Sequence, residues 1–134
     1  MKTSKRQFML TAAAISLLSV AATNVQAQTW PQRPIRVVVT FAPGGSSDIV
    51  ARLIQPGLQE KLGQPVIVEN KPGGGSTIGG YEVAKAAPDG YTLLLSNTAP
   101  ISISPFMLEK PTYDPIKSFT HIAYIGSVPN VFVV

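Results

Sequence analysis

Cysteine is absent from this 134-residue chain, histidine occurs once, and charged side chains are scarce. Without cysteine there is no disulfide framework, no thiolate metal site and no cysteine nucleophile. The lone His121 leaves no second imidazole for a histidine-based zinc cluster. Charged residues make up 13% of the chain, a low share that excludes an acidic disordered protein and a coiled coil. We expect neither a metal nor a cofactor.

The net charge of +4 does not indicate a nucleic-acid partner. Three of the eleven basic residues lie within the first six positions, as Lys2, Lys5 and Arg6. The rest of the chain holds eight lysines and arginines against seven acidic residues, so its net charge is only +1. A sequence-wide basic patch of the kind that binds phosphate backbones is therefore missing.

The first 27 residues have the organisation of a secretory signal peptide. A basic start is followed by an apolar stretch over residues 8–22, and Val25-Gln26-Ala27 supplies small residues for cleavage after Ala27. The apolar core is short for a membrane span, which needs about 20 residues. The motif at residues 4–9 also resembles a weakened twin-arginine signal. We expect an exported, periplasmic chain.

Residues 28–134 have the length of one small domain. The β-branched run at residues 131–134 predicts a strand, and the sequence stops inside it. We therefore expect the chain to be part of a longer protein.

A strand, a glycine loop and a helix follow one another after residue 34. The β-branched run over residues 35–41 predicts a strand that is buried on both faces. The turn at residues 43–45 leads to Ser46, Ser47 and Asp48, each a candidate helix N-cap. Apolar residues then recur at helical spacing up to Leu62. Pro56 predicts a kink or two short helices, and Gly63 predicts the stop.

The same pattern then repeats. The sequence predicts strands at 65–70 and 91–96, with a glycine-rich loop at 71–77 and a helix at 78–86 between them. A short helical or irregular stretch to Leu108, a proline-rich loop at 110–119 and strands at 120–125 and 131–134 complete the prediction. Alternating strands and helices indicate an α/β fold, a parallel sheet with flanking helices.

Three small, polar loops follow the predicted strands, at residues 43–48, 72–77 and 96–98. The carboxyl ends of parallel strands form the ligand crevice of an open α/β sheet. Glycines let a ligand approach the backbone, and helix N-termini favour an anion there. The loops therefore predict an anion pocket without strongly basic side chains.

Nucleotide and hydrolase motifs are missing from these loops. Neither G-x-x-x-x-G-K-[ST] nor G-x-G-x-x-G fits the glycine run at 73–75, which argues against a nucleotide site. G-x-S-x-G is also absent, so no catalytic residue is assigned. The alternative from a different functional class is an exported α/β hydrolase with Ser46 or Ser47 as nucleophile, whose acid and base would lie in the part of the protein missing from this chain.

Six segments in order resemble the Bug proteins, the extracytoplasmic receptors of tripartite tricarboxylate transporters. They cover essentially all of the chain after the leader: WPQRPIR at 30–36, FAPGGSSD at 41–48, LGQPVIVENKPG at 62–73, VAKAAPDGYTLL at 83–94, YDP at 113–115 and VPNV at 128–131. The resemblance implies a periplasmic-binding-protein-like fold of two α/β lobes. This chain would supply only the first part of lobe 1, truncated at the lobe crossover.

The resemblance also implies a function, which is non-covalent capture of a small organic carboxylate by backbone amides and its delivery to membrane transporter subunits. The implied binding positions lie in the first two loops: Phe41, Ala42, Gly44, Gly45, Ser46, Asp48, Gly74, Gly75, Ser76 and Thr77. We add Ser96, Asn97 and Thr98 from the third loop. Thr77 departs from the asparagine that is common in the family, so the ligand preference can differ. A sensor lobe of a signalling system would use the same pocket and is not separated by sequence.

Overall fold

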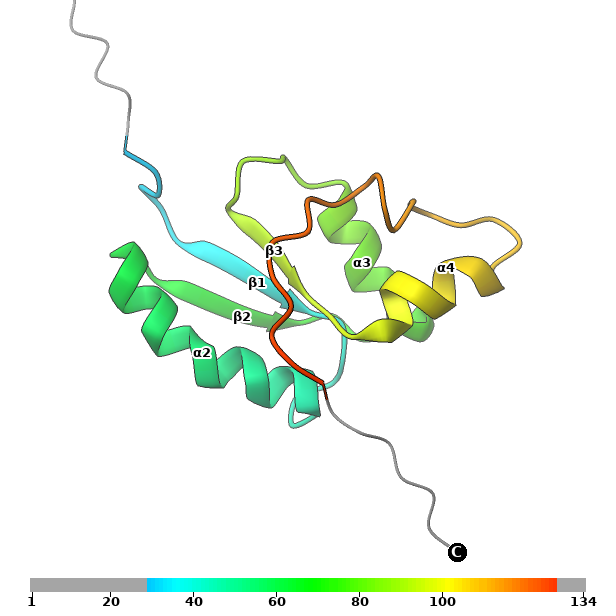
Figure 1. Ribbon diagram of the computed structural model, residues 1–134, viewed down its shortest axis with the longest axis horizontal. Coiled ribbons are helices and arrows are strands. Elements are labelled where there is room, and N and C mark those ends of the chain that lie inside the picture. The colour runs from blue at the N-terminus through cyan, green and yellow to red at the C-terminus, as the bar shows by residue number, and fades with distance from the viewer. Residues whose placement is uncertain (1–28, 128–134) are drawn as a thin grey trace, which may run out of the picture. The chain divides into compact units, whose positions relative to one another are not determined.

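The computed structural model describes residues 29–127, and the predicted leader and the strand at 131–134 lie outside this range. Three parallel strands form one sheet: β1 (Ile35–Val39), β2 (Val66–Asn70) and β3 (Thr92–Leu95), in the order β2-β1-β3. All three arrows point the same way in Figure 1. The register places Val39 opposite both Asn70 and Leu95, so the three strands end together. The predicted α/β class with a parallel sheet is confirmed.

The central strand β1 is buried on both faces, as its β-branched run predicts. Ile35, Val38 and Val39 are fully buried and Val37 is 5% exposed. Because side chains alternate along a strand, Val38 faces one layer of helices, whereas Val37 and Val39 face the other. The two outer strands are less covered. The run of apolar residues at 93–95 is typical of a buried strand, but in β3 only Leu95 is buried, because β3 is an edge strand within the described residues.

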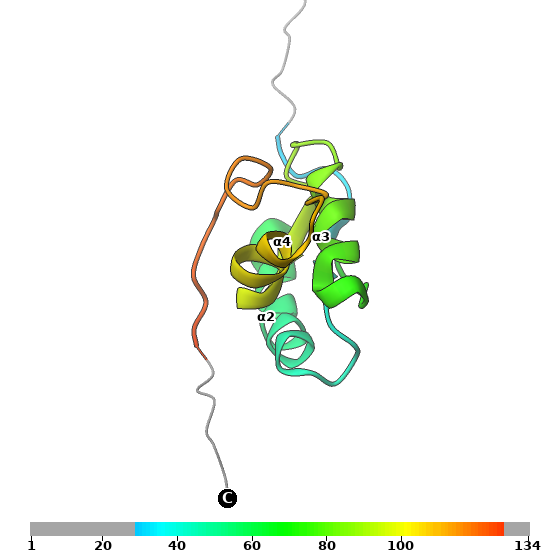
Figure 2. The same cartoon turned by 90° about the vertical axis from the view of Figure 1, so that its right-hand side faces the viewer.

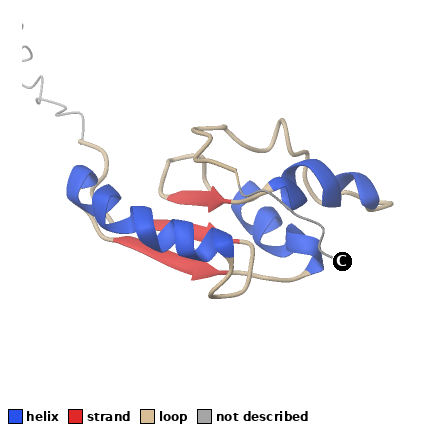
Figure 3. Cartoon of the chain, turned by 60° about the horizontal axis from the view of Figure 1, so that its bottom comes forward, coloured by secondary structure: helices blue, strands red, loops and turns tan. Residues whose placement is uncertain are grey.

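One face of the sheet is covered by α2 (Ser46–Leu62), which lies along the strands in Figure 3. Ala51 is buried in the core with Val37 and Val39, and Ile54 and Leu58 pack against the same cluster. Of the two outcomes predicted for Pro56, a kink or two short helices, the second is wrong, since a single helix runs through Pro56. Apolar residues on both sides of Pro56 pack on the sheet, and this packing outweighs one lost backbone hydrogen bond. Gly63 ends the helix in the left-handed conformation, as predicted.

The other face of the sheet is covered by α3 (Thr77–Ala84), which follows a 3₁₀ turn at Gly74–Ser76. Right-handed crossovers explain this placement, because the chain moves from β1 to β2 and then back past β1 to β3. This layer is polar. Arg36 of β1 forms ion pairs with Glu69 of β2, at 3.2 Å, and with Glu82 of α3.

After β3 the chain forms a π-helix at Ala99–Ile103 and then α4 (Ser104–Met107), and α4 lies beside α3 in Figure 2. Tyr113, in the loop that follows α4, packs back against this layer. Its side chain is 7% exposed, and its hydroxyl donates to the Pro100 carbonyl oxygen at 2.6 Å. The ring leaves no room for a side chain at position 80, where a Cβ would lie 2.6 Å from the Tyr113 hydroxyl oxygen.

The predicted strand at 120–125 is wrong, because residues 120–127 have no regular secondary structure. Ile122 and Tyr124 are 77% and 81% exposed. A strand needs a neighbouring strand to receive its backbone hydrogen bonds, and none pairs with this segment in the part of the chain that the structure describes. Among residues 29–127, no helix has both the length and the apolar character needed to cross a bilayer.

Candidate functional site

The three predicted loops lie at one edge of the sheet. In the structure, where Ser46 and Thr77 already belong to helices, the loops cover residues 40–45, 71–76 and 96–98, and we call them the first, second and third loop. Each follows the carboxyl end of a strand, and the first two lead into α2 and α3. Since the strands are parallel and end in register, the loops emerge together, as Figure 1 shows.

The first loop is a tight turn fastened by backbone hydrogen bonds. Gly44 has φ +84°, a conformation that favours glycine. The Gly45 N–H donates to the Ala42 carbonyl oxygen at 3.3 Å, and the Gly44 N–H donates to Asp48 Oδ2 at 2.9 Å. These two amides are thus used inside the loop. The exposed residues Ala42 and Gly44 border the open side of the turn.

Asp48 holds the first loop rather than facing solvent, because its side chain is only 5% exposed. Its Oδ1 accepts from Arg52 Nε at 3.0 Å and from Asn70 Nδ2 at 3.0 Å. Hydrogen bonds from Arg52, the Gly44 N–H and Asn70, in that order, lower the pKa of Asp48 to about 2. The carboxylate is therefore charged at every physiological pH.

The N-cap of α2 is Gly45, without a side-chain hydrogen bond, so the predicted Ser46, Ser47 or Asp48 cap is wrong. Asp48 is the third residue of the helix, and its side chain accepts from the Gly44 N–H. The cap position itself is taken by Gly45, which has an extended backbone. Helix geometry leaves the N–H groups of the first helical turn without intrahelical partners. Ser46 is exposed there and Ser47 is buried. The positive end of α2 thus opens at the loop edge.

Four consecutive residues of the second loop have positive φ. Gly73, Gly74 and Gly75 have φ of +120°, +56° and +61°, and Ser76 follows with φ +75°. Ser76 is the non-glycine residue with positive φ among residues 29–127, and it is 5% exposed. Such a conformation is strained for serine and is held by its surroundings.

Two hydroxyl groups fasten the second loop. Thr77 Oγ1 donates to the Gly74 carbonyl oxygen at 2.6 Å, and Ser104 Oγ donates to the Gly75 carbonyl oxygen at 2.6 Å. Both bonds turn carbonyl oxygens inward, which leaves Gly74 and Gly75 exposed at the loop surface. The predicted Thr77 hydroxyl is therefore engaged in holding the loop.

The third loop forms a local turn. Asn97 Oδ1 accepts from the Ala99 N–H at 2.9 Å, and Ser96 Oγ donates to the Asn97 carbonyl oxygen at 3.2 Å. Asn97 and Thr98 are exposed. Among the described residues, no hydrogen bond joins Ser96, Asn97 or Thr98 to the first two loops.

Three residues that hold this edge together had no assigned role from sequence. Asn70 and Arg52 link the first loop to β2 and α2, and Ser104 links the second loop to α4. The spacing of Asp48 and Arg52, four residues apart on a helix, is a sequence signal for an ion pair. Ser104 gave no signal, because its partner lies 29 residues away in the chain.

The described residues supply no base to either candidate nucleophile of the hydrolase alternative, whose acid and base are expected outside this chain. Within residues 29–127, neither Ser46 nor Ser47 forms a hydrogen bond to a histidine or a carboxylate, and His121 lies on an exposed segment. A nucleophile needs such a base within reach. The same residues contain no group of three or more side chains that could hold a metal ion.

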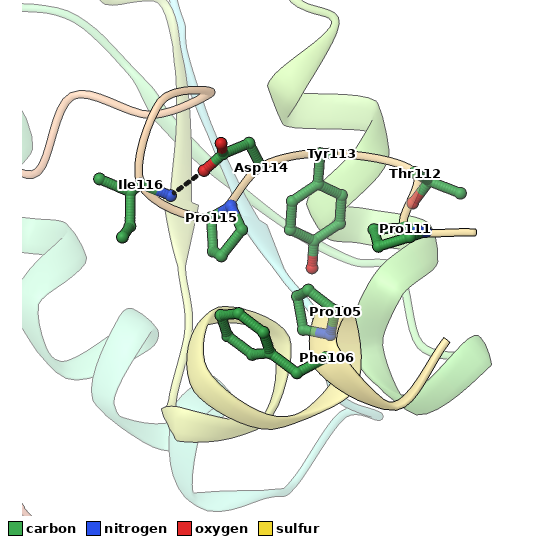
Figure 4. Close-up of a pocket in the computed structure, with 8 residues that line it drawn as sticks. All are labelled: Pro105, Phe106, Pro111, Thr112, Tyr113, Asp114, Pro115 and Ile116. Carbon is green, nitrogen blue, oxygen red and sulfur yellow. Dashed lines mark hydrogen bonds between the residues drawn. The ribbon is translucent and has the colours of Figure 1, made fainter. Parts of the chain in front are cut away.

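A hollow of about 560 Å³ lies beside α4, and none of its lining residues belongs to the three loops. Its lining is largely apolar, and Figure 4 shows the Phe106 ring facing Pro115, with Tyr113 beside Pro115. Asp114 at its rim accepts from the Ile116 and Lys117 N–H groups at 2.9 and 3.0 Å. These bonds, that from Lys117 first and that from Ile116 second, lower the pKa of Asp114 and define a turn within the predicted proline-rich loop.

A parallel α/β lobe with glycine-rich loops at its carboxyl edge defines a ligand-binding class of protein. Residues 50–134 match the family described as the tripartite tricarboxylate transporter family receptor, and the chain belongs to this family. Protein BugT of Bordetella pertussis is 43% identical over 113 residues, which is 84% of this chain and 35% of BugT. The chain thus spans about a third of the length of its curated relatives.

Two solved structures are similar in fold and sequence. The periplasmic binding protein BugD is 45% identical, with a TM-score of 0.59 over 67% of this chain and 30% of BugD. MatC of Rhodopseudomonas palustris, solved with bound malate, is 43% identical, with a TM-score of 0.65 over 68% of this chain and 31% of MatC. The fold described here is therefore part of one lobe of a periplasmic binding protein, and these neighbours are binding proteins.

Proposed function

We propose that this chain is the amino-terminal part of lobe 1 of a receptor that captures a small organic carboxylate. The observation that carries the proposal is the meeting of two glycine-rich loops and two helix N-termini at one edge of a parallel sheet. Backbone N–H groups and the positive helix ends suit a carboxylate there. The malate bound to MatC supports this ligand class.

The pocket would bind without covalent chemistry. Free N–H groups of the first turn of α2 and the exposed glycines of the second loop are the donors that suit a carboxylate, while the loop hydroxyls tune the fit. The wider set of pocket residues is the one expected from sequence, in all three loops, except that the Gly44 and Gly45 N–H groups and the Asp48 carboxylate are already used within the first loop. The second lobe, which would come from the remaining length seen in the relatives, would close over the ligand.

The setting of the receptor is part of the same proposal. We assign residues 1–27 as a leader that is cleaved after Ala27, residues 28–134 as the lobe segment, and the periplasm as the location. The family description supports handing of the ligand to membrane subunits of a tripartite tricarboxylate transporter. We assign no catalytic residue, because the loops offer hydrogen-bond donors and no activated nucleophile.

A thermal-shift experiment on the full-length receptor that carries this sequence tests the function. Malate, citrate, glutamate and benzoate sample four carboxylate classes, and malamide serves as the neutral control for malate. At 100 times its dissociation constant, a true ligand raises the melting temperature of a receptor of the relatives' length by about 4 °C. Malamide should give no shift. If none of the acids shifts the transition, or malamide shifts it as much as malate, the carboxylate proposal is wrong.

A further inference from the structure

Three polar side chains from two elements converge behind the first loop. Asp48 and Arg52 lie one turn apart on α2, and Asn70 ends β2. Arg52 Nε contacts both carboxylate oxygens of Asp48, at 3.0 and 3.1 Å, and Arg52 Nη2 donates to Asn70 Oδ1 at 3.2 Å. Asn70 Nδ2 closes the ring by donating to Asp48 Oδ1 at 3.0 Å. We call this group the Asp48–Arg52–Asn70 clamp.

The clamp reaches the first loop at two points. Asp48 Oδ2 accepts from the Gly44 N–H at 2.9 Å, and Asn70 Nδ2 donates to the Phe41 carbonyl oxygen at 3.0 Å. These bonds fix both ends of the turn that precedes α2. Because the turn sets the direction in which the first amides of α2 open, the clamp controls the geometry of the donors.

Asp48 has no oxygen left to contact a ligand well. Its carboxylate accepts from Gly44, Arg52 and Asn70, and its side chain is only 5% exposed. A bare carboxylate close to a carboxylate pocket would also repel the ligand. Arg52 removes this cost, since its guanidinium lies against Asp48 and half of its side chain is exposed to solvent.

We propose that Arg52 is a positioning residue for the carboxylate pocket and acts through Asp48, whose role is to hold the first loop rather than to contact the ligand. The inference rests on the proposed function. It assigns the expected pocket residue Asp48 to the scaffold, and it adds Arg52 and Asn70 to the residues on which affinity depends. Arg52 has a double task, to hold the Asp48 carboxylate in place and to neutralise its charge.

The test compares Arg52→Gln, Arg52→Lys and the double variant Asp48→Asn with Arg52→Gln in the full-length receptor. Calorimetry measures malate affinity, and hydrogen exchange of the peptide covering residues 41–48 measures order of the first loop without ligand. Arg33→Gln is the matched control, because Arg33 pairs with Asp89 at 2.9 Å on an exposed surface. Arg52→Gln should weaken malate binding about 10-fold or more and speed loop exchange by a similar factor.

The rescue variants separate positioning from general stability. Arg52→Lys keeps the positive charge four residues from Asp48 and should recover most of the affinity. The double variant removes the uncompensated charge and should bind malate more tightly than Arg52→Gln alone. Arg33→Gln should leave both affinity and exchange unchanged.

Two different failures have different meanings. If the unmodified receptor binds none of the carboxylates, the proposed function fails, and the exchange data alone decide whether the clamp holds the loop. If the receptor binds malate but Arg52→Gln changes neither affinity nor exchange, the clamp proposal is overturned and the function stands. Equal affinity loss in Arg52→Gln, Arg52→Lys and the double variant also overturns it.

Discussion

Asn70 donates to two acceptors through one side-chain amide: the Phe41 carbonyl oxygen and Asp48 Oδ1, each at 3.0 Å. The amide nitrogen has two hydrogens, so both are used. Its oxygen accepts from Arg52 at 3.2 Å. The last residue of β2 therefore links the loop that follows β1 to the first turns of α2, so that strand, loop and helix form one hydrogen-bonded unit at this edge of the sheet.

Asn70→Asp should disrupt this unit more than Asn70→Ala. The alanine variant loses the three hydrogen bonds, whereas the aspartate variant also brings a second carboxylate against Asp48. We expect the free energy of unfolding to fall by about 1 kcal/mol for alanine and about 2 kcal/mol or more for aspartate. Urea unfolding at neutral pH measures both. An aspartate variant as stable as the unmodified receptor would show that the bonds contribute nothing.

Gly80 and Gly57 should respond to alanine in opposite directions. A Cβ at position 80 would lie 2.6 Å from the Tyr113 hydroxyl oxygen, whereas a Cβ at position 57 would meet nothing within 4 Å. Gly80→Ala should displace the Tyr113 ring and cost about 1–3 kcal/mol. Gly57→Ala lies inside α2 and should gain about 0.5–1 kcal/mol.

Chemical unfolding of the two variants measures this difference. Equal stability of Gly80→Ala and Gly57→Ala would mean that Tyr113 does not pack as described. A loss in Gly57→Ala would mean that α2 is distorted around Pro56.

The stability of the receptor should depend on the protonation of Asp48 in strong acid. Its folded pKa of about 2 lies below the ordinary value of 3.8, so protonation favours the unfolded chain. The contribution is complete above the ordinary pKa and is lost as the pH falls through the folded pKa. The free energy of unfolding, measured roughly at unit intervals between pH 5 and 2, should therefore fall more steeply with decreasing pH for the unmodified receptor than for Asp48→Asn. Parallel curves would contradict the hydrogen-bonded carboxylate.

The strands and first helix could be predicted because their signals are local. The β-branched run at 35–39 and the apolar stripe of α2 determine their own burial. The two short helices considered for Pro56 do not form, because packing on the sheet compensates for a missing N–H, and packing is not visible in a short window. The strand expected at 120–125 failed for a related reason, since β-branched residues form a strand only beside a partner strand.

The position of the site could be predicted from sequence, but the contacts that hold its loops in place could not. Parallel strands bring their loops to one edge, so Gly44, Gly45, Gly74 and Gly75 could be grouped before the structure was known. The roles of Asp48, Asn70 and Ser104 depend on contacts between distant parts of the chain. Sequence spacing does not give such contacts, and Asp48 entered the expected binding set through the family resemblance alone.

Ser46 provides the most direct test that backbone amides hold the carboxylate. Ser46 is the first residue of α2, and the preceding Gly45 has φ −74° and ψ 165°, which a following proline tolerates. Ser46→Pro therefore removes one N–H while keeping the helix start. Ser46→Ala keeps that N–H and removes only the hydroxyl.

Calorimetric titration of malate into the full-length receptor and these two variants is the measurement that decides. Ser46→Pro should weaken binding about 10-fold or more, because a hydrogen bond to a charged group is lost, and Ser46→Ala should lose clearly less. Gly57→Ala should bind as the unmodified receptor does. If Ser46→Pro binds malate as tightly as the unmodified receptor, the amides of the first turn of α2 do not hold the carboxylate, and the central claim is wrong.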